Sequence, residues 1–261
     1  MATRPERALS GDDVKARFNA FASILYYTRA AHSLGLWKSE RSLIERWFPD
    51  RTASLLEAGC GAGRVTLGMW DLGYRHLKAF DFAEELREQA QSLALERGAA
   101  VRLVHADATR IERGQLGLQA GQWFDGALFM FNGLMQIPGR RRRRDALRQL
   151  GLLCRPNAPL LFTSHDRDLP PDERDLWSQE AARWASGSQD PRLTDFGDRY
   201  FQNESGDVFI HIPDRREILD DLAATGWLHA HDIMRHMMGR ESRAVIDFSD
   251  DCRFWIARRD A

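Results

Sequence analysis

Short apolar runs alternate with amphipathic stretches along the chain between residues 50 and 165. The apolar runs predict five strands, at 54–58, 76–80, 101–105, 124–131 and 159–163. The intervening stretches repeat their apolar residues every three to four positions, which predicts helices, most clearly over 83–96 and 141–153. The run at 124–131 is apolar at nearly every position, as is typical of a central parallel strand. This alternation predicts an α/β fold around a mostly parallel sheet.

The pattern changes on both sides of this core. Upstream, Asp12 or Asp13 can begin a helix whose apolar face extends to Tyr27, and a second helix is predicted over 38–48. Downstream, we expect a polar helix over 170–184, a hairpin over 197–212, a helix over 213–224, and strands at 227–233 and 253–257. We therefore expect a helical cover over 1–50, a sheet domain over 51–261, and within it an inserted lid at about 168–212.

Composition limits the classes of partner. The chain has 261 residues, enough for one sizeable core, and a formal net charge of −1, so it has no strong field to gather nucleic acid or an anionic membrane. Only three of its 37 basic residues are lysines, so a single arginine carries little information. The arginine run at 140–144 is expected to be a solvated helix face, with phosphate binding as the alternative.

The cysteines and the N-terminal segment indicate a cytoplasmic protein. Cys60, Cys154 and Cys252 are far apart and show no C-x-x-C spacing, which argues against a disulfide framework or a structural zinc site. The first residues are charged and lack the apolar core of a signal peptide, and no apolar stretch is long enough to span a bilayer. A metal site at His229, His231 and Asp232 is disfavoured because no second ligand pair is evident.

The first predicted strand runs into a glycine turn, with the sequence LLEAGCGAGR over 55–64. A strand that breaks into such a turn and opens a helix is how α/β proteins hold a nucleoside-like cofactor. Glycine permits the unusual φ values and lets a ligand lie against bare backbone. The G-x-G-x-G spacing and the preceding Glu57 do not suit a pyrophosphate, which a carboxylate would repel, but they suit an ammonium group.

The ends of the next strands offer matching groups. Asp81 ends the second strand, where its carboxylate can accept two ribose hydroxyls, and Phe82 can pack on an adenine face. Asp107 ends the third strand and can accept the adenine amino group. The segment 129–132 ends the fourth strand at the same edge of the sheet. Four consecutive strand ends therefore carry suitable groups in the right order.

These motifs resemble those of the class I S-adenosylmethionine-dependent methyltransferases. The similar segments are LLEAGCGAGR (55–64), AFDFAEEL (79–86), HADA (105–108), FDGALFMFNGL (124–134) and LCRPNAPLLFTS (153–164). Pro156, Asn157 and Ala158 replace the glycines usual in the last segment, a departure that affects loop geometry. Segments outside this core, such as FIHIPDRREI (209–218), resemble a group of bacterial methyltransferases without an assigned substrate.

The resemblance implies a Rossmann-like seven-stranded, mostly parallel sheet and S-adenosylmethionine as the cofactor. It implies that Glu57 contacts the methionine amino group, directly or through water, and that Asp81 holds the ribose. The other residues that it implies around the cofactor are Tyr27, Gly59, Cys60, Gly61, Gly63, Phe82, Asp107, Ala108 and Phe131. The expected activity is transfer of the methyl group to a small-molecule acceptor, leaving S-adenosylhomocysteine.

The acceptor side carries four candidate residues. His165, just past the fifth strand, is the candidate general base, with a structural hydrogen-bonded histidine as the alternative. Asn132 is expected to orient the acceptor, and His211 and Trp177 to reach it from the lid; a solvent-facing strand residue and a lid anchor are their respective alternatives. The fourth-strand motif lacks the N/D-P-P-Y/F signature, so a nucleobase or release-factor substrate loses support.

Three other functions remain open from the sequence. A methyltransferase acting on RNA or protein would need an exposed, basic site. A nicotinamide-dependent oxidoreductase would need the third-glycine spacing that is missing here. A non-catalytic S-adenosylmethionine-binding protein would have lid side chains filling its acceptor side. We expect a small-molecule acceptor, no nucleic-acid or membrane partner, and no bound metal.

Overall fold

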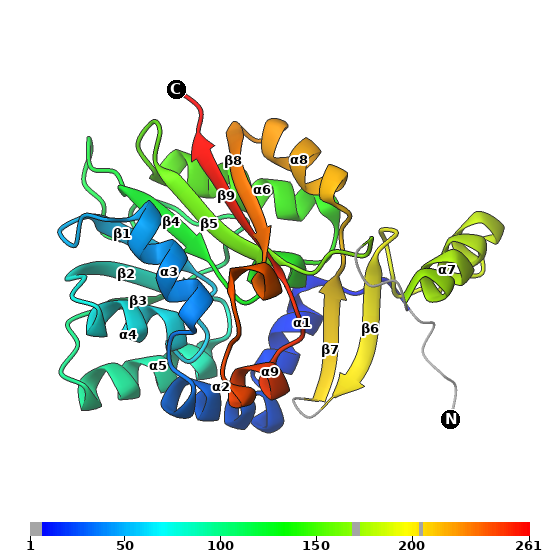
Figure 1. The fold of residues 1–261 in the computed structure, drawn as a ribbon, viewed down its shortest axis with the longest axis horizontal. Coiled ribbons are helices and arrows are strands. Elements are labelled where there is room, and N and C mark those ends of the chain that lie inside the picture. Colours follow the sequence, from blue (N-terminus) through cyan, green and yellow to red (C-terminus); the bar gives the residue numbers. More distant parts are fainter. Residues whose placement is uncertain (1–6, 169–172, 204–205) are drawn as a thin grey trace.

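The computed structural model describes residues 7–168, 173–203 and 206–261. Its centre is a seven-stranded sheet with the strand order β3-β2-β1-β4-β5-β9-β8 (Figure 1). The strands are β1 (Ser54–Ala58), β2 (His76–Asp81), β3 (Arg102–His105), β4 (Gly126–Phe129), β5 (Pro159–Ser164), β8 (Trp227–Met234) and β9 (Arg253–Arg259). The first five pair in parallel, and β9 lies antiparallel to both β5 and β8. The expected seven-stranded, mostly parallel α/β sheet is confirmed.

Helices cover both faces of this sheet. One face packs against α6 (Arg140–Leu153) and α8 (Arg215–Ala223). The other packs against α3 (Lys38–Trp47), α4 (Arg64–Asp71) and α5 (Glu84–Glu96). The two faces alternate along each strand, so that Leu55 lies in one core and its neighbour Leu56 in the other. Burial on both faces explains why the strands are apolar at successive positions.

The N-terminal region contains one more helix than the sequence indicates. Where a single helix is expected up to Tyr27, the structure has α1 (Gly11–Phe18) and α2 (Phe21–Ser33). The N-cap is also different: it is Ser10, not Asp12 or Asp13. The Ser10 hydroxyl accepts the backbone N–H of Asp13, and the Asp13 carboxylate accepts the backbone N–H of Ser10. The helix predicted over 38–48 is confirmed as α3.

The region between β5 and α8 lies outside the seven-stranded sheet. It contains α7 (Arg174–Ser186), which projects from the body, and a separate hairpin of β6 (Asp198–Asn203) and β7 (Gly206–His211) (Figure 1). The start predicted for the helix, at residue 170, and turn residues Glu204 and Ser205 lie outside the described residues. The hairpin also holds the N-terminal region, since Arg17 on α1 forms an ion pair of 2.9 Å with Asp207.

Within the described residues, three short helical segments are absent from the sequence-based expectation. They are η1 (Gly133–Gln136), η3 (Arg235–Met238) and α9 (Arg243–Phe248). The last two lie in the connection 235–252 between β8 and β9, which we call the β8–β9 strap; in Figure 1 α9 lies beside α2. None of the described helices is long and apolar enough to cross a membrane.

A buried charge network anchors the hairpin to the helices. The His211 ring is fully buried between two carboxylates, with Nδ1 2.8 Å from Asp198 Oδ1 and Nε2 2.8 Å from Glu217 Oε1. Arg143, 1% exposed, lies 3.3 Å from the same Glu217 oxygen and 3.2 Å from Asp195. Burial opposes ionisation of Glu217, but the bond and charge of His211, with the nearby arginines, lower its pKa to about 2.

This network also accounts for a cluster with metal-ligand chemistry. Ligand atoms of Asp195, Asp198 and His211 lie within 4.8 Å of one another. His211 is bonded to Asp198, however, and Asp195 accepts from Arg143 and from the backbone N–H of Arg140. These carboxylates are thus already matched by protein cations and donors.

Arg143→Met is expected to lower the free energy of unfolding by about 3–5 kcal/mol, because Glu217 and Asp195 would lose a buried cation. Urea denaturation measures the loss. The control is Arg148→Met on the same helix, where the guanidinium pairs with Asp145 on the surface and a change below about 0.5 kcal/mol is expected. Equal losses in the two variants would show that the network contributes no stability.

Candidate active site

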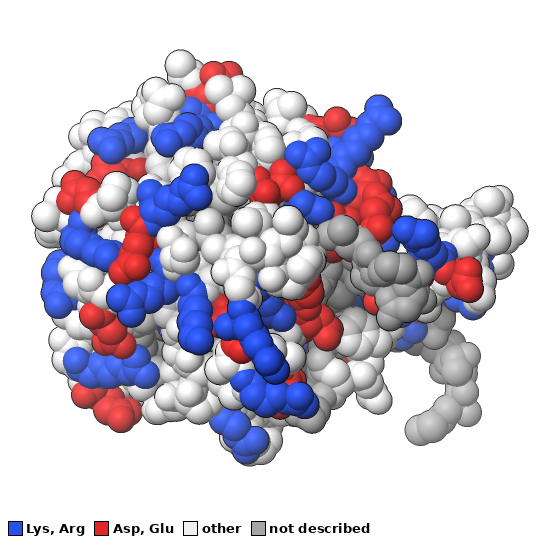
Figure 2. Space-filling model, viewed as in Figure 1, with Lys and Arg blue, Asp and Glu red and all other residues white. Residues whose placement is uncertain are grey.

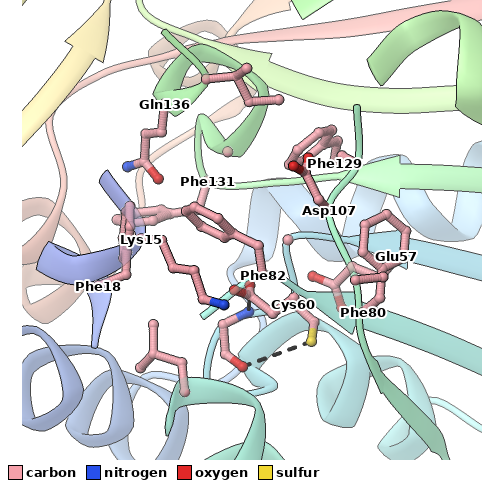
Figure 3. A pocket seen from close by; sticks show the side chains of 18 of the residues that line it. Lys15, Phe18, Glu57, Cys60, Phe80, Phe82, Asp107, Phe129, Phe131 and Gln136 are labelled. Atoms are coloured by element: carbon pink, nitrogen blue, oxygen red, sulfur yellow. Dashed lines mark hydrogen bonds between the residues drawn. The ribbon is translucent and has the colours of Figure 1, made fainter. Parts of the chain in front are cut away.

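A cavity of about 940 Å³ lies at the carboxyl edge of the sheet (Figure 3). Its lining includes the ends of β1, β2, β3 and β4 on one side, and residues of α1, α2, η1 and α9 on the other. The volume is at the upper end of the about 300–1,000 Å³ typical of small-molecule sites. The location is the one at which open α/β sheets bind their ligands.

The glycine turn forms one wall of this cavity. Gly59, Gly61 and Gly63 have φ values of 62°, 52° and 85°, in the left-handed region. A Cβ at Gly59 would lie 2.7 Å from the Phe129 ring, so only glycine fits there. Gly61 has open space on its Cβ side, which leaves the backbone bare toward the cavity.

Gly63 has a different place from the one expected. It is absent from the cavity lining and is instead the N-cap of α4, where a Cβ would lie 3.1 Å from that of Ala90. Its glycine is explained by close packing of α4 on α5 and by its left-handed backbone.

Asp81 holds the glycine turn. Its Oδ2 accepts the Gly61 N–H at 2.7 Å, and its Oδ1 accepts the Ala83 N–H at 2.8 Å. Burial raises the pKa of this carboxyl to about 6, although the backbone donors oppose the rise. An ionised carboxylate has about four lone-pair sites, so two remain after the backbone bonds, enough for a pair of hydroxyls.

Glu57 is a buried carboxyl beside the turn. It is 5% exposed and accepts the hydroxyl of Thr66 through Oε2. Burial raises its pKa to about 8, against the opposing effect of the Thr66 bond. A cationic ligand placed beside it would favour its ionised form.

Most of the other expected cofactor residues line the same cavity. They are Tyr27, Cys60, Phe82, Asp107, Ala108 and Phe131. Asp107 Oδ1 accepts the N–H and the hydroxyl of Thr109, at 2.9 and 2.8 Å, and Oδ2 lies 3.4 Å from Arg110. The structure therefore brings together, at one edge, residues separated by up to about 100 positions in the chain.

An aromatic group forms the wall opposite the glycine turn. The Phe131 ring stacks on Phe248 at 5.3 Å between centroids and meets Tyr27 and Trp37 edge-on at 6.0 and 5.6 Å. Sequence reasoning missed Phe248, because the β8–β9 strap has no regular pattern to place it. It also missed Lys15, Phe18 and Gln136, which line the cavity (Figure 3); the apolar face of the first helix was the available signal for Phe18.

Asn132 and His165 form a hydrogen-bonded pair outside the cavity lining. Asn132 Nδ2 lies 3.0 Å from His165 Nε2, and His165 Nδ1 lies 2.9 Å from the carbonyl oxygen of Asp251. Neither side chain is among the described residues that line the cavity, although Phe131 and Gly133 on either side of Asn132 do line it. The base role of His165 stays a prediction.

The two lid residues lie elsewhere. His211, expected to reach the acceptor, is enclosed by Asp198 and Glu217, because both of its ring nitrogens face carboxylates. Trp177 packs against Phe196 at 6.0 Å and donates to Glu173 at 3.1 Å, so it anchors α7 and is not among the cavity-lining residues. We correct both placements: neither side chain reaches the cavity in this structure.

Comparison with known families decides the identity. Residues 55–157 match the model of a methyltransferase domain family. These residues form a class I S-adenosylmethionine-dependent methyltransferase domain. The chain therefore contains a methyltransferase domain of the class that uses S-adenosylmethionine as its methyl donor. No curated protein matches the chain.

Solved structures share the fold of the methyltransferase domain at low sequence identity. An S-adenosylmethionine-dependent methyltransferase from Methanosarcina mazei matches with a TM-score of 0.64 and 14% identity, over 84% of this chain and 97% of its own. The [4+2]-cyclase SpnF matches with a TM-score of 0.65 and 16% identity, over 99% of this chain and 100% of its own. A 1,6-didemethyltoxoflavin-N1-methyltransferase from Burkholderia thailandensis, with bound S-adenosylhomocysteine, matches with a TM-score of 0.56 and 18% identity. The match covers 92% of this chain and 89% of that one.

The residues present fit the cofactor. The bare backbone at Gly61 leaves room for close approach, Asp81 keeps free lone pairs, and Glu57 is a buried carboxyl with only a hydroxyl as hydrogen-bond partner among the described residues. This donor and acceptor set matches an ammonium and a ribose, as the methyltransferase domain requires.

Glu57→Gln is expected to change the pH dependence of stability in the ligand-free methyltransferase domain. With a folded pKa of about 8 against 4.5 unfolded, Glu57 makes the free energy of unfolding fall as pH rises from about 4.5 to 8. At pH 8 the variant should be more stable than the wild type by roughly 3–5 kcal/mol, and the gain should vanish near pH 4.5. Thermal and urea unfolding across this range measure it.

The matched control is Glu96→Gln, at an exposed position of α5. It should leave the wild-type pH profile in place. A gain from Glu57→Gln that is the same at every pH would show that Glu57 is not protonated in the folded protein.

Proposed function

We propose that this enzyme transfers the methyl group of S-adenosylmethionine to a small-molecule acceptor. The observation that carries the proposal is one cavity of about 940 Å³, which the glycine turn and the acidic strand ends line together with residues of α1, α2, η1 and α9. A cavity walled by covering segments suits an acceptor that enters it whole, whereas a polymer needs an open groove.

In our proposal the cofactor lies along the carboxyl edge of the sheet. Glu57 receives the methionine ammonium, and the backbone around Cys60 and Gly61 lies against the methionine and ribose parts. Asp81 accepts the ribose hydroxyls, while Phe82, Asp107 and Ala108 surround the adenine. Tyr27 and Phe131 close the site from the opposite wall. All of these residues line the cavity.

Methyl transfer then requires mainly that the acceptor atom be aligned with the methyl group. The bound sulfonium supplies an already activated methyl group. The chain orients the acceptor in line with it and keeps water out, which the aromatic wall of Phe131, Tyr27 and Phe248 favours. A base is needed only if the acceptor must lose a proton.

Surface charge supports a small acceptor over RNA. Lys and Arg are interspersed with Asp and Glu over the face shown in Figure 2. In the arginine run 140–144, Arg140 and Arg144 both lie 2.7 Å from Asp221, and Arg143 is buried against Glu217. These arginines are neutralised by carboxylates, so they do not form a phosphate-binding patch.

Two structurally similar proteins also favour a small-molecule acceptor. The 1,6-didemethyltoxoflavin-N1-methyltransferase and a magnesium protoporphyrin IX methyltransferase from Synechocystis, which matches with a TM-score of 0.54, have small molecules in their names.

We propose that residues 1–50 cover the cofactor and that the insertion at 168–212 is a lid held through α1. Arg17 links the two, with its guanidinium 4.4 Å from the Tyr200 ring centroid.

Calorimetric titration with S-adenosylhomocysteine tests the cofactor site. We expect micromolar binding by the wild type and a loss of at least tenfold in Asp81→Ala, since the variant removes both the ribose acceptor and the bond to Gly61. The control Asp71→Ala removes an exposed carboxylate on α4 and should bind normally. Absence of wild-type binding, or tight binding of NADH, would contradict the proposal.

Methyl labelling tests the acceptor class. The wild type is incubated with S-adenosylmethionine carrying a radioactive methyl group and with a cell extract split into a low-molecular-mass filtrate and a macromolecular fraction. We expect label in a small product from the filtrate, absent with Asp81→Ala. Label confined to RNA or protein would overturn the small-molecule assignment while leaving the cofactor site intact.

A further inference from the structure

One part of the cavity lining carries no charge. It consists of the lining residues that belong to α2, to the segment 129–138 and to α9, and we call it the uncharged wall. Tyr27 and Gln136 are its polar side chains among the described residues, and its other members are apolar or glycine. The carboxylates assigned to the cofactor, Glu57, Asp81 and Asp107, all lie in the remainder of the lining. The two parts of the cavity therefore suit ligand groups of different polarity.

Aromatic rings connect the members of the uncharged wall. Phe131 stacks on Phe248 at 5.3 Å between centroids and meets Tyr27 edge-on at 6.0 Å. The backbone is strained at this point, because Phe131 and Asn132 have φ values of 51° and 58°, a region that side chains rarely adopt. Strain of this kind gathers at functional sites. Directly after it, the turn η1 carries Gln136 into the cavity (Figure 3), so the strained segment supplies both the ring and the amide.

Arg64 is a cation at the edge of this wall, and its charge is already matched. Its guanidinium lies 5.7 Å from the centre of the Phe131 ring. Two hydrogen bonds of 2.6 Å join it to the two carboxylate oxygens of Glu40, which is 1% exposed. A charged group placed on the uncharged wall would lose its hydration and find no unmatched charge among the described residues of the wall. The wall therefore favours an uncharged ligand.

Tyr27 and Gln136 are accessible from inside the cavity. Both side chains line it and are half-buried, so a ligand there can reach them. Burial raises the pKa of Tyr27 well above its ordinary value, and hydrogen bonding with Gln136 opposes the rise only in part, so Tyr27 keeps its proton. Apart from each other, neither side chain has a hydrogen-bond partner within the described part of the chain.

This pair leaves a donor and an acceptor free whichever way it is bonded. If the Gln136 amine donates to the Tyr27 oxygen, the Tyr27 O–H and the Gln136 carbonyl oxygen stay free. If the Tyr27 hydroxyl donates to the Gln136 carbonyl oxygen, the Gln136 amine and a lone pair of the Tyr27 oxygen stay free. A ligand group that both donates and accepts, such as a primary amide or a hydroxyl, satisfies either arrangement.

We infer that the methyl acceptor is an uncharged aromatic compound, whose ring packs on the uncharged wall and whose amide or hydroxyl group binds Tyr27 and Gln136. This rests on the proposed function and narrows its substrate class. Gln136 is the specificity-determining residue, because it sets the charge that the wall accepts. Acceptors that place a carboxylate, a phosphate or an ammonium group here are disfavoured, and saturated rings lose the aromatic contacts with Phe131 and Phe248.

The test uses four probes of similar shape on the protein saturated with S-adenosylhomocysteine. Benzamide has the inferred chemistry. Benzoate and benzamidine replace its amide with an anion and a cation, and cyclohexanecarboxamide replaces its ring. Ligand-observed NMR titration should show the wild type binding benzamide at least tenfold more tightly than either charged probe. It should bind benzamide about two- to tenfold more tightly than cyclohexanecarboxamide.

Gln136→Glu should shift the preference toward the cation. A carboxylate at this position should improve the binding of benzamidine relative to benzamide at least tenfold over the wild type, a gain that a misfolded protein would not show. Tyr27→Phe should weaken benzamide binding about two- to tenfold, because a hydrogen-bonding group is lost. The matched control is Gln115→Glu, the same change at an exposed position of the cavity lining between β3 and β4. It should keep the wild-type order of the probes.

Several results would overturn the inference. Absence of benzamide binding is one, and equal binding of benzamide and a charged probe or the saturated ring by the wild type is another. The same shift toward benzamidine in Gln115→Glu would make the preference a general effect of charge in the cavity. A tenfold loss of S-adenosylhomocysteine affinity in Gln136→Glu would assign Gln136 to the cofactor. If the wild type does not bind S-adenosylhomocysteine at all, it is the proposed function that fails.

Discussion

The hydrogen bond from the Gly61 N–H to the Asp81 carboxylate is the contact on which the site depends. It joins the turn after β1 to the end of β2, at 2.7 Å, and the second carboxylate oxygen binds the N–H of Ala83. One side chain thereby fixes two loops at the carboxyl edge of the sheet. The bare backbone of Gly61, the start of α4 and the position of Phe82 all follow from this bond, and so does the floor of the cavity.

Burial of charge is the second constraint, and the protein meets it in two ways. Some buried ions are paired: Arg64, which lines the cavity, lies 2.6 Å from Glu40, and His211, away from the cavity, lies between Asp198 and Glu217. Such pairs are costly to break. Inside the cavity, Glu57 and Asp81 have no ion-pair partner among the described residues, and burial raises the pKa of each. Carboxyls that stay unpaired in a buried site are suited to a cationic or hydroxyl-bearing ligand.

Much of the fold and the cofactor side of the site could be predicted from the sequence, because both follow from local patterns. The strand Ser54–Ala58 and the helix Lys38–Trp47 were placed correctly to within a residue by their apolar spacing. The residues after consecutive parallel strands meet at one edge by topology alone, which is why Glu57, Asp81 and Asp107 could be grouped.

The remainder depends on tertiary contacts that no local pattern records. His211 alternates along β7 like any strand residue, and only the fold reveals the two carboxylates around it. Phe248 ends the short helix α9, and its place is set by Phe131 and Tyr26, which lie far from it in sequence. The orientation of the Asn132 amide needs a carbonyl at Asp251, more than a hundred residues away.

The strand order has a consequence for the sequence of events during synthesis. β9 is the last strand of the sheet along the chain, yet it lies between β5 and β8. The β8–β9 strap, which brings Phe248 to the cavity and the Asp251 carbonyl to His165, leads into β9, and the Tyr26 hydroxyl donates to its Phe248 carbonyl. The glycine turn and its acidic partners are synthesised before this strap, so the cavity lacks the Phe248 part of its wall until the strap has been made. A segment far from the glycine turn in sequence therefore completes the cavity that the turn begins.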